Sequence, residues 1–147
     1  MKPAEINDLL PFLLRKENVA RYEDGCVVIG DRRKYPFEKV FVRCDDVESV
    51  ARAIEEMVTQ GGGPSNAALY AMALTARRVA GQPAGRQREA FEAARKRLVK
   101  TRPTNTALAR RLEMAMQVIE RAIDAGQNVE EMLLAWIEEF RDANLQN

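Results

Sequence analysis

The sequence predicts a mainly α-helical protein in which a small N-terminal antiparallel β-meander packs on a bundle of about five helices. Two observations predict this class. Alternating apolar residues around a turn signal are confined to residues 19–44, whereas apolar residues at helical spacing run through residues 45–147 between capping residues. A chain of 147 residues is most simply one domain, 1–147, with residues 1–18 as an N-terminal helical segment.

The first elements are a helix and three short strands. Leucines recur at helical spacing over residues 4–18, where Pro11 is expected to kink or break the helix. Strand and turn signals then predict the meander. Two strands are expected within residues 19–31 around a turn at 23–25, followed by a loop at 32–37 and a third strand at 38–44.

Capping residues divide the remainder into five helices. Asp45, with Glu48 three residues later, predicts a capping box at the first of them. Ser65, Thr104 or Asn105, and Asn128 are expected to cap the second, fourth and fifth helices. The apolar side chains expected to face the core are Val47, Val50, Ala51, Ile54, Met57, Val58, Phe91, Ala94, Leu98, Val99, Leu108, Leu112, Ala115, Met116, Ile119, Ile123, Met132, Leu133, Trp136, Ile137 and Phe140.

Charge and hydropathy exclude two classes of partner. The net charge of +1 predicts no general attraction to nucleic acid. A basic stripe runs from Arg77 to Arg102, but such stripes are usually solvated helix faces, and this one has no interleaved aromatic residues for base stacking. No apolar stretch is long enough to span a bilayer, and the N-terminus lacks a signal-peptide pattern, so we expect a cytoplasmic protein with no membrane contact.

The sequence is poor in catalytic side chains. It contains no histidine, which removes the commonest general base, the Ser-His and Cys-His pairs and most zinc sites. Cys26 and Cys44 flank two expected strands, and a disulfide between them is geometrically conceivable. A cytosolic location favours two reduced thiols. We expect no metal, no cofactor and no catalytic residue.

The stretch TQGGGPSNAALYAMAL, residues 59–74, places three glycines directly before a helix. Two interpretations are open. The glycines can form a turn that separates two helices. They can also let several backbone N–H groups converge on an anion beside the positive end of the helix.

Three motifs, in order, resemble the N-terminal domain of S-methyl-5-thioribose-1-phosphate isomerases, a family related to ribose-1,5-bisphosphate isomerases and to regulatory subunits of eukaryotic initiation factor 2B. Residues 31–36, DRRKYP, stand where the family has Asp-Gln-Arg…Leu-Pro, and residues 57–64, MVTQGGGP, where it has Met-Val-x-Arg-Gly-Ala-Pro. Arg102-Pro103-Thr104 matches its Arg-Pro-Thr motif. The resemblance runs from about Val19 to the end of the chain.

The resemblance implies a phosphate site but not a catalytic one. The family's catalytic cysteine and aspartate belong to a C-terminal Rossmann-like domain and its connecting segment, and neither cysteine of this chain matches them. By position, the family's phosphate contacts fall on Gln60, Gly61, Gly62 and Arg102. Gln60 replaces an arginine, so one cation is lost. Arg102 has two interpretations, either a phosphate contact or a partner for a helix C-terminus or a carboxylate.

Three hypotheses for function follow. The chain is a stand-alone or regulatory form of the domain that binds a phosphate or sugar phosphate without chemistry. Alternatively, it is half of a split aldose-ketose isomerase that a separate α/β chain completes. As a third possibility, it is an interaction module like the initiation factor subunits. The last two predict an exposed apolar surface, which a partner protein or a second copy covers.

Overall fold

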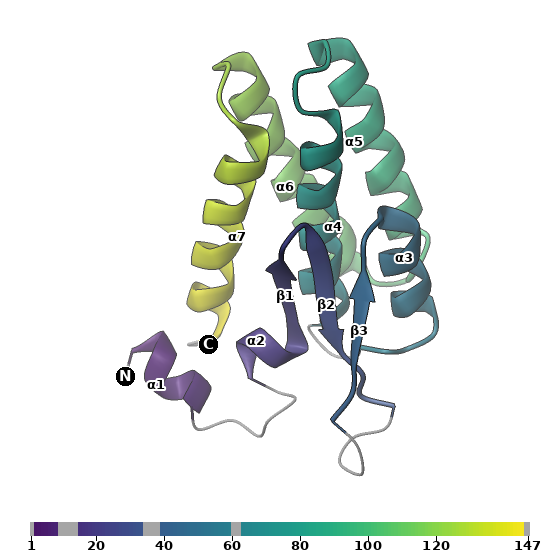
Figure 1. Ribbon diagram of the computed structural model, residues 1–147, viewed down its shortest axis with the longest axis vertical. Helices are drawn as coiled ribbons and strands as arrows, with labels where there is room; N and C mark the ends of the chain where they lie inside the picture. Colours follow the sequence, from purple (N-terminus) through teal and green to yellow (C-terminus); the bar gives the residue numbers. More distant parts are fainter. Residues whose placement is uncertain (1, 9–14, 34–38, 60–62, 146–147) are drawn as a thin grey trace.

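The computed structural model describes residues 2–8, 15–33, 39–59 and 63–145 (Figure 1). Seven helices and three strands lie within these residues and confirm the mainly α-helical class. In chain order they are α1 (Pro3–Asp8), α2 (Lys16–Val19), β1 (Ala20–Glu23), β2 (Cys26–Gly30), β3 (Phe41–Cys44), α3 (Val47–Glu55), α4 (Gly63–Val79), α5 (Ala84–Val99), α6 (Thr106–Asp124) and α7 (Val129–Leu145).

The strands form the predicted antiparallel meander in the order β1-β2-β3. Tyr22 pairs with Val27 across the first hairpin, and Val27 pairs with Cys44 across the second. Asp24 and Gly25 join β1 to β2 with φ angles of 52° and 72°. Positive φ at both central residues is the conformation that a two-residue hairpin turn requires, and Asp-Gly adopts it readily.

Helix α4 is the centre of the fold. It contacts α3, α5, α6, α7, β1 and β2, and Figure 1 shows it behind the sheet with α7 on one side and α3 on the other. Its side chains from Ala67 to Ala76 are all buried. A helix that is apolar on every face must be covered on every face, and its many alanines let the neighbouring helices approach closely.

The caps confirm some expectations and correct others. Asn105 and Asn128 cap α6 and α7 as predicted, accepting the N–H groups of Leu108 and Glu131 at 2.9 Å. The capping box of α3 is shifted by one residue, because its N-cap is Asp46, whose Oδ1 accepts Ser49 N–H at 2.7 Å. Asp45 and Glu48 therefore do not form the predicted box.

Other expectations about boundaries and burial were wrong. Ser65 does not cap α4, because that helix already begins at Gly63. The helix expected over residues 4–18 is divided into α1 and α2, and Pro11 lies outside the described residues. The third strand begins at Phe41, whereas residue 38 was expected. Met57 and Met132, both expected in the core, are 48% and 41% exposed.

Met57 is exposed because it occupies a strained position after α3. Its φ is 62°, and its N–H donates to Ile54 O while the Val58 N–H donates to Ala53 O. These two bonds define a Schellman C-cap, in which the left-handed residue is normally glycine. The strain turns the Met57 side chain away from the core face that its spacing predicted.

We expect Met57→Gly to raise the free energy of unfolding by about 0.5–1 kcal/mol, because glycine adopts positive φ without steric cost. The matched control is Glu56→Gly at the preceding position, where φ is −82° and glycine gains nothing. Urea unfolding of both variants measures the difference. A destabilised Met57→Gly variant would show that contacts of the methionine side chain outweigh the backbone strain.

Part of the basic stripe is neutralised within the bundle. Arg88 pairs with Glu120 and Asp124, and Arg97 pairs with Glu48 and Glu55 at 2.8 and 2.9 Å. These pairs join α5 to α6 and to α3, so these two arginines make inter-helix contacts. Within the described part of the chain, no helix combines the length and the apolar character needed to cross a membrane.

Candidate functional site

Arg102 lies half buried after α5, and its Nη2 donates to Ile54 O at 3.0 Å. Ile54 is in the last turn of α3, where the helix dipole is negative, and its carbonyl group also accepts the N–H of Met57. This contact shows that Arg102 does pair with a helix C-terminus, one of its two predicted roles. The guanidinium has further N–H groups, and among the described residues Ile54 O is its one hydrogen-bond acceptor, so these groups can still donate to a second partner.

The glycine segment is described only at its two ends. Gln60, Gly61 and Gly62 lie outside the described residues, so their predicted role stays a prediction. Thr59 precedes them and is 1% exposed, and its Oγ1 is buried with no hydrogen-bond partner among the described groups. A buried hydroxyl without a partner costs about 1–3 kcal/mol, so such groups in native proteins call for an explanation.

Thr59 lies directly against the start of α4. A Cβ atom added to Gly63 would lie 1.7 Å from Thr59 Oγ1, so only glycine fits at this contact. The unpartnered hydroxyl is thus beside the first turn of a 17-residue helix, whose N–H groups carry the positive end of the dipole. These are the features of an anion-binding position, a helix N-terminus and a further hydrogen-bond donor.

All three motifs that carry the family resemblance meet near the C-terminal end of α3. The Arg32 N–H donates to Val58 O at 2.8 Å, which ties residues 31–33 to the segment after α3. Asp31, 2% exposed, accepts Arg33 Nε at 3.0 Å and Arg33 Nη2 at 2.8 Å. Arg102 joins the same place through Ile54. The fold therefore assembles three segments that are far apart in the sequence.

The two cysteines of the sheet do not face each other. Cys44 pairs with Val27, whereas Cys26 pairs with Glu23, so the two cysteine side chains lie on opposite faces of the sheet. Both are free thiols, and no disulfide joins them. Burial raises the pKa of Cys44 to about 11, which keeps it protonated at neutral pH.

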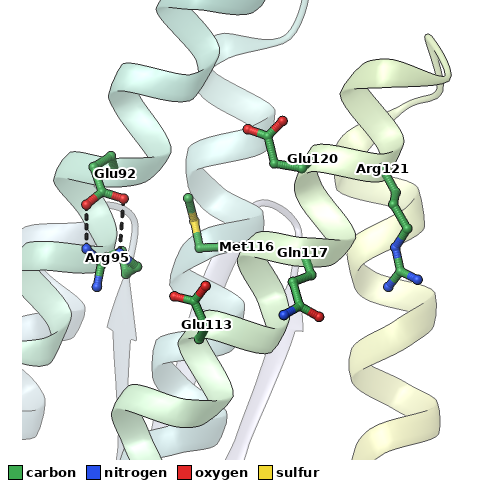
Figure 2. Close-up of a pocket in the computed structure, with 7 residues that line it drawn as sticks. All are labelled: Glu92, Arg95, Glu113, Met116, Gln117, Glu120 and Arg121. Carbon is green, nitrogen blue, oxygen red and sulfur yellow. Dashed lines mark hydrogen bonds and ion pairs between the residues drawn. The ribbon is translucent and has the colours of Figure 1, made fainter.

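A hollow in the surface lies between α5 and α6, away from the segments described above (Figure 2). Its volume is about 600 Å³, and Met116, expected in the core, lies partly exposed along it. Figure 2 shows Glu92 and Arg95 paired on α5, opposite acidic side chains of α6 such as Glu113. The side chains that line it are partly or fully exposed, and Glu120 pairs with Arg88 outside it, so we do not assign a site to this hollow.

Comparison with known proteins shows which proteins this chain is similar to. No protein-family model matches the sequence. The chain is 36% identical over 118 residues to a methylthioribose-1-phosphate isomerase from Ectopseudomonas mendocina, covering 78% of this chain and 33% of that protein. It is 33% identical over 123 residues to one from Herpetosiphon aurantiacus, covering 82% and 34%.

Solved structures agree with this assignment. The 5-methylthioribose 1-phosphate isomerase of Pyrococcus horikoshii superposes with a TM-score of 0.74 and 25% identity, covering 98% of this chain and 38% of that chain. This chain belongs to the methylthioribose-1-phosphate isomerase and initiation factor 2B-like family. The delta subunit of translation initiation factor eIF-2B from A. fulgidus also matches, with a TM-score of 0.71, 27% identity and coverage of 82% and 35%. The chain spans about a third of the length of these relatives.

The site predicted from the sequence is thus only partly described. Arg102 is placed at the end of α3, which is one of its two predicted roles. Thr59 was not considered, because nothing in the sequence shows that its hydroxyl would be buried without a partner. The signal that could have indicated it is its position two residues before three glycines, where a side chain has little neighbouring bulk.

Proposed function

We propose that this chain acts as a cytoplasmic phosphate-binding domain of its family, with Gln60, Gly61, Gly62 and Arg102 as contacts for a sugar phosphate and no catalytic residue of its own. The observation that carries the proposal is the convergence of the three family motifs near the end of α3, beside the unpartnered Thr59 hydroxyl and the start of α4. A phosphate at this place would accept hydrogen bonds from the helix N-terminus and from Arg102.

The affinity is expected to be weak. Gln60 stands where the family has an arginine, and a neutral amide donates hydrogen bonds without neutralising charge. Arg102 already donates to Ile54 O, so only its remaining N–H groups are available. A dissociation constant of about 1 mM for inorganic phosphate is consistent with one cation and a few backbone donors.

A phosphate titration followed by amide NMR tests this proposal. The amides of Gly61, Gly62, Gly63 and Ser65 are expected to shift, with saturation at roughly ten times the dissociation constant. Gln60→Arg should tighten binding about tenfold by adding a charge-assisted contact, and Arg102→Ala should weaken it by a similar factor. Arg86→Ala, an exposed change at the opposite end of α5, is the matched control and should leave binding unchanged.

The same variants separate the two roles of Arg102. If Arg102 only caps α3, Arg102→Ala will lower the free energy of unfolding equally with and without phosphate. If it also binds phosphate, the stabilisation that phosphate gives to the wild type will be smaller in the variant. Amide shifts confined to residues outside this segment would leave the glycine stretch as a turn.

A second candidate is one subunit of an aldose-ketose isomerase that a separate α/β chain completes. A groove of about 530 Å³ between α6 and α7, lined in part by Met132 and Trp136, offers an apolar surface for such a partner. The same groove would suit assembly with other subunits, since the initiation factor relative is named as a subunit.

We expect no turnover of methylthioribose 1-phosphate by the purified chain, because it has no histidine and no matching cysteine–aspartate pair. Turnover that Arg102→Ala abolishes would contradict this expectation, and turnover that appears only with an added α/β chain would establish the second candidate.

A further inference from the structure

Arg141 on α7 is a buried cation without a carboxylate partner. It follows Leu133 and Ile137 at intervals of four residues, so it continues the buried stripe of the helix, and it is 6% exposed. Its Nη1 donates to Ala20 O at 2.6 Å and to Tyr70 Oη at 3.0 Å, and its Nη2 donates to Lys16 O at 2.6 Å. All three acceptors are neutral, and among the described residues no carboxylate forms an ion pair with Arg141.

Part of this guanidinium remains available for a ligand. It carries five N–H groups, and three of them make the bonds above. One N–H on Nε and one on Nη2 have no acceptor among the described residues. Donors on these two neighbouring nitrogens form the fork that binds a carboxylate through both of its oxygens. Buried arginine normally has such a partner.

A pocket of about 360 Å³ opens onto this guanidinium, and we call it the Arg141 pocket. It is lined by Lys16, Glu17, Ala20, Arg21, Tyr22, Tyr70, Leu134, Glu138 and Arg141. The rings of Tyr22 and Tyr70 are stacked with centroids 6.0 Å apart, and Leu134 adds an aliphatic surface. The volume and the mixture of apolar surface with a few polar groups are typical of sites for small molecules.

Several of the other charged groups of the pocket have partners of their own. Lys16 Nζ pairs with Glu138 and with Asp142, the latter at 2.7 Å, and Arg21 pairs with Glu23. Glu17 accepts the Asn7 side-chain amide at 2.6 Å, and its carboxylate also attracts Arg141 electrostatically. Tyr70 donates to Glu138 Oε1 at 2.9 Å, and burial raises the pKa of its hydroxyl, which therefore remains protonated. What Arg141 offers a ligand is therefore its two unused N–H groups and not an isolated charge.

We propose that the Arg141 pocket binds a small organic molecule that has one carboxylate and a flat apolar body. The carboxylate lies on Nε and Nη2 of Arg141, and the apolar body lies against Tyr22, Tyr70 and Leu134. This site is distinct from the phosphate site. Arg102 contacts α3, whereas the Arg141 pocket is built by α2, β1, α4 and α7, and Figure 1 shows α3 and α7 on opposite sides of α4.

Benzoate is a suitable probe, and the neutral benzamide is its matched control. In a titration of the whole chain followed by ¹H–¹⁵N NMR, benzoate is expected to shift the Arg141 Nε–H signal and the amides of β1 with a dissociation constant of about 1 mM. Benzamide should cause no comparable shift, because it cannot neutralise the guanidinium. Absence of these shifts with tens of millimolar benzoate, a range chosen to exceed that estimate, or equal shifts with benzamide, would overturn the proposal.

Three variants test the electrostatic part. Glu138→Gln removes a negative charge at the pocket while an amide oxygen can still accept from Tyr70, so benzoate should bind about two- to fivefold more tightly. Glu139→Gln removes the same charge from the next residue, which does not line this pocket, and should change binding little. Arg141→Lys, checked for folding by circular dichroism, should weaken binding at least about tenfold, because an ammonium cannot form the fork. Equal affinities for Glu138→Gln and Glu139→Gln would also overturn the proposal, even if Arg141→Lys failed to fold.

Discussion

Gly63→Ala is expected to lower the free energy of unfolding by about 2–3 kcal/mol, because no space exists for a methyl group at the start of α4. The added Cβ would lie 1.7 Å from Thr59 Oγ1, 3.0 Å from Thr59 Cβ and 3.4 Å from Val19 Cγ1. Thr59 is β-branched and buried, so its side chain cannot rotate away without leaving its rotamer or moving the backbone. Urea unfolding followed by circular dichroism measures the loss.

A double-mutant cycle identifies the cause of that loss. Thr59→Ala removes the hydroxyl that Gly63→Ala would meet, so the double variant should recover about 1–2 kcal/mol of the loss expected from simple addition. Gly85→Ala is the matched control, because no atom lies within 4 Å of its added Cβ and the residue is inside α5. That control should stabilise the protein by about 0.5–1 kcal/mol through helix propensity. Additive effects of the two substitutions at Thr59 and Gly63 would refute the steric explanation.

The fold could be predicted because its signals are local. Asp24-Gly25 specifies a hairpin turn through backbone conformation alone, and Asn105 and Asn128 specify helix starts through hydrogen bonds to residues three positions away. The change from strand alternation to helical spacing after β3 is likewise read within a short window. Turns and caps formed between residues close in the sequence depend little on the rest of the fold, and so the order of strands and helices after residue 19 was predicted correctly.

The errors occur where backbone geometry at a helix end decides the outcome. Ser65 has the chemistry of an N-cap, but α4 begins two residues earlier, at Gly63, whose missing side chain leaves room for the buried Thr59 hydroxyl. Met57 has core spacing, but the C-cap of α3 holds it at positive φ and out of the core. In both cases the geometry of a helix end, which apolar spacing does not encode, overrides the pattern.

The candidate site was predictable only as far as the motifs reach. They selected Arg102, but not its contact with Ile54 O, because a bond between segments 48 residues apart follows from packing and not from spacing. Arg141 was missed altogether, although a signal was present. It stands where the buried stripe of Leu133 and Ile137 places the next apolar residue, and a charged residue at such a position indicates a special role.

Arg141→Met is expected to lower the free energy of unfolding by about 2–3 kcal/mol. Methionine keeps much of the aliphatic packing, so the loss comes mainly from the three hydrogen bonds that hold α7 to α2, β1 and α4. Lys16 O retains the N–H of Ala20 as a donor, and Tyr70 retains Glu138 as an acceptor, which keeps the cost below that of three orphaned groups.

Hydrogen exchange should locate this effect. Amides of α2 and β1 are expected to exchange faster in Arg141→Met than in the wild type, whereas those of α5 and α6 should follow only the global change in stability. Arg121 is an exposed arginine of α6 that forms no ion pair with a described residue, so Arg121→Met is the matched control and should change stability by less than about 0.5 kcal/mol. Because no carboxylate among the described residues forms an ion pair with Arg141, replacing it leaves no ion-pair partner buried alone, the usual source of large losses at buried ion pairs. An Arg141→Met variant with unchanged stability would therefore mean that the guanidinium does not hold α7 in place. The burial of Arg141 would then have to be explained by the proposed ligand alone.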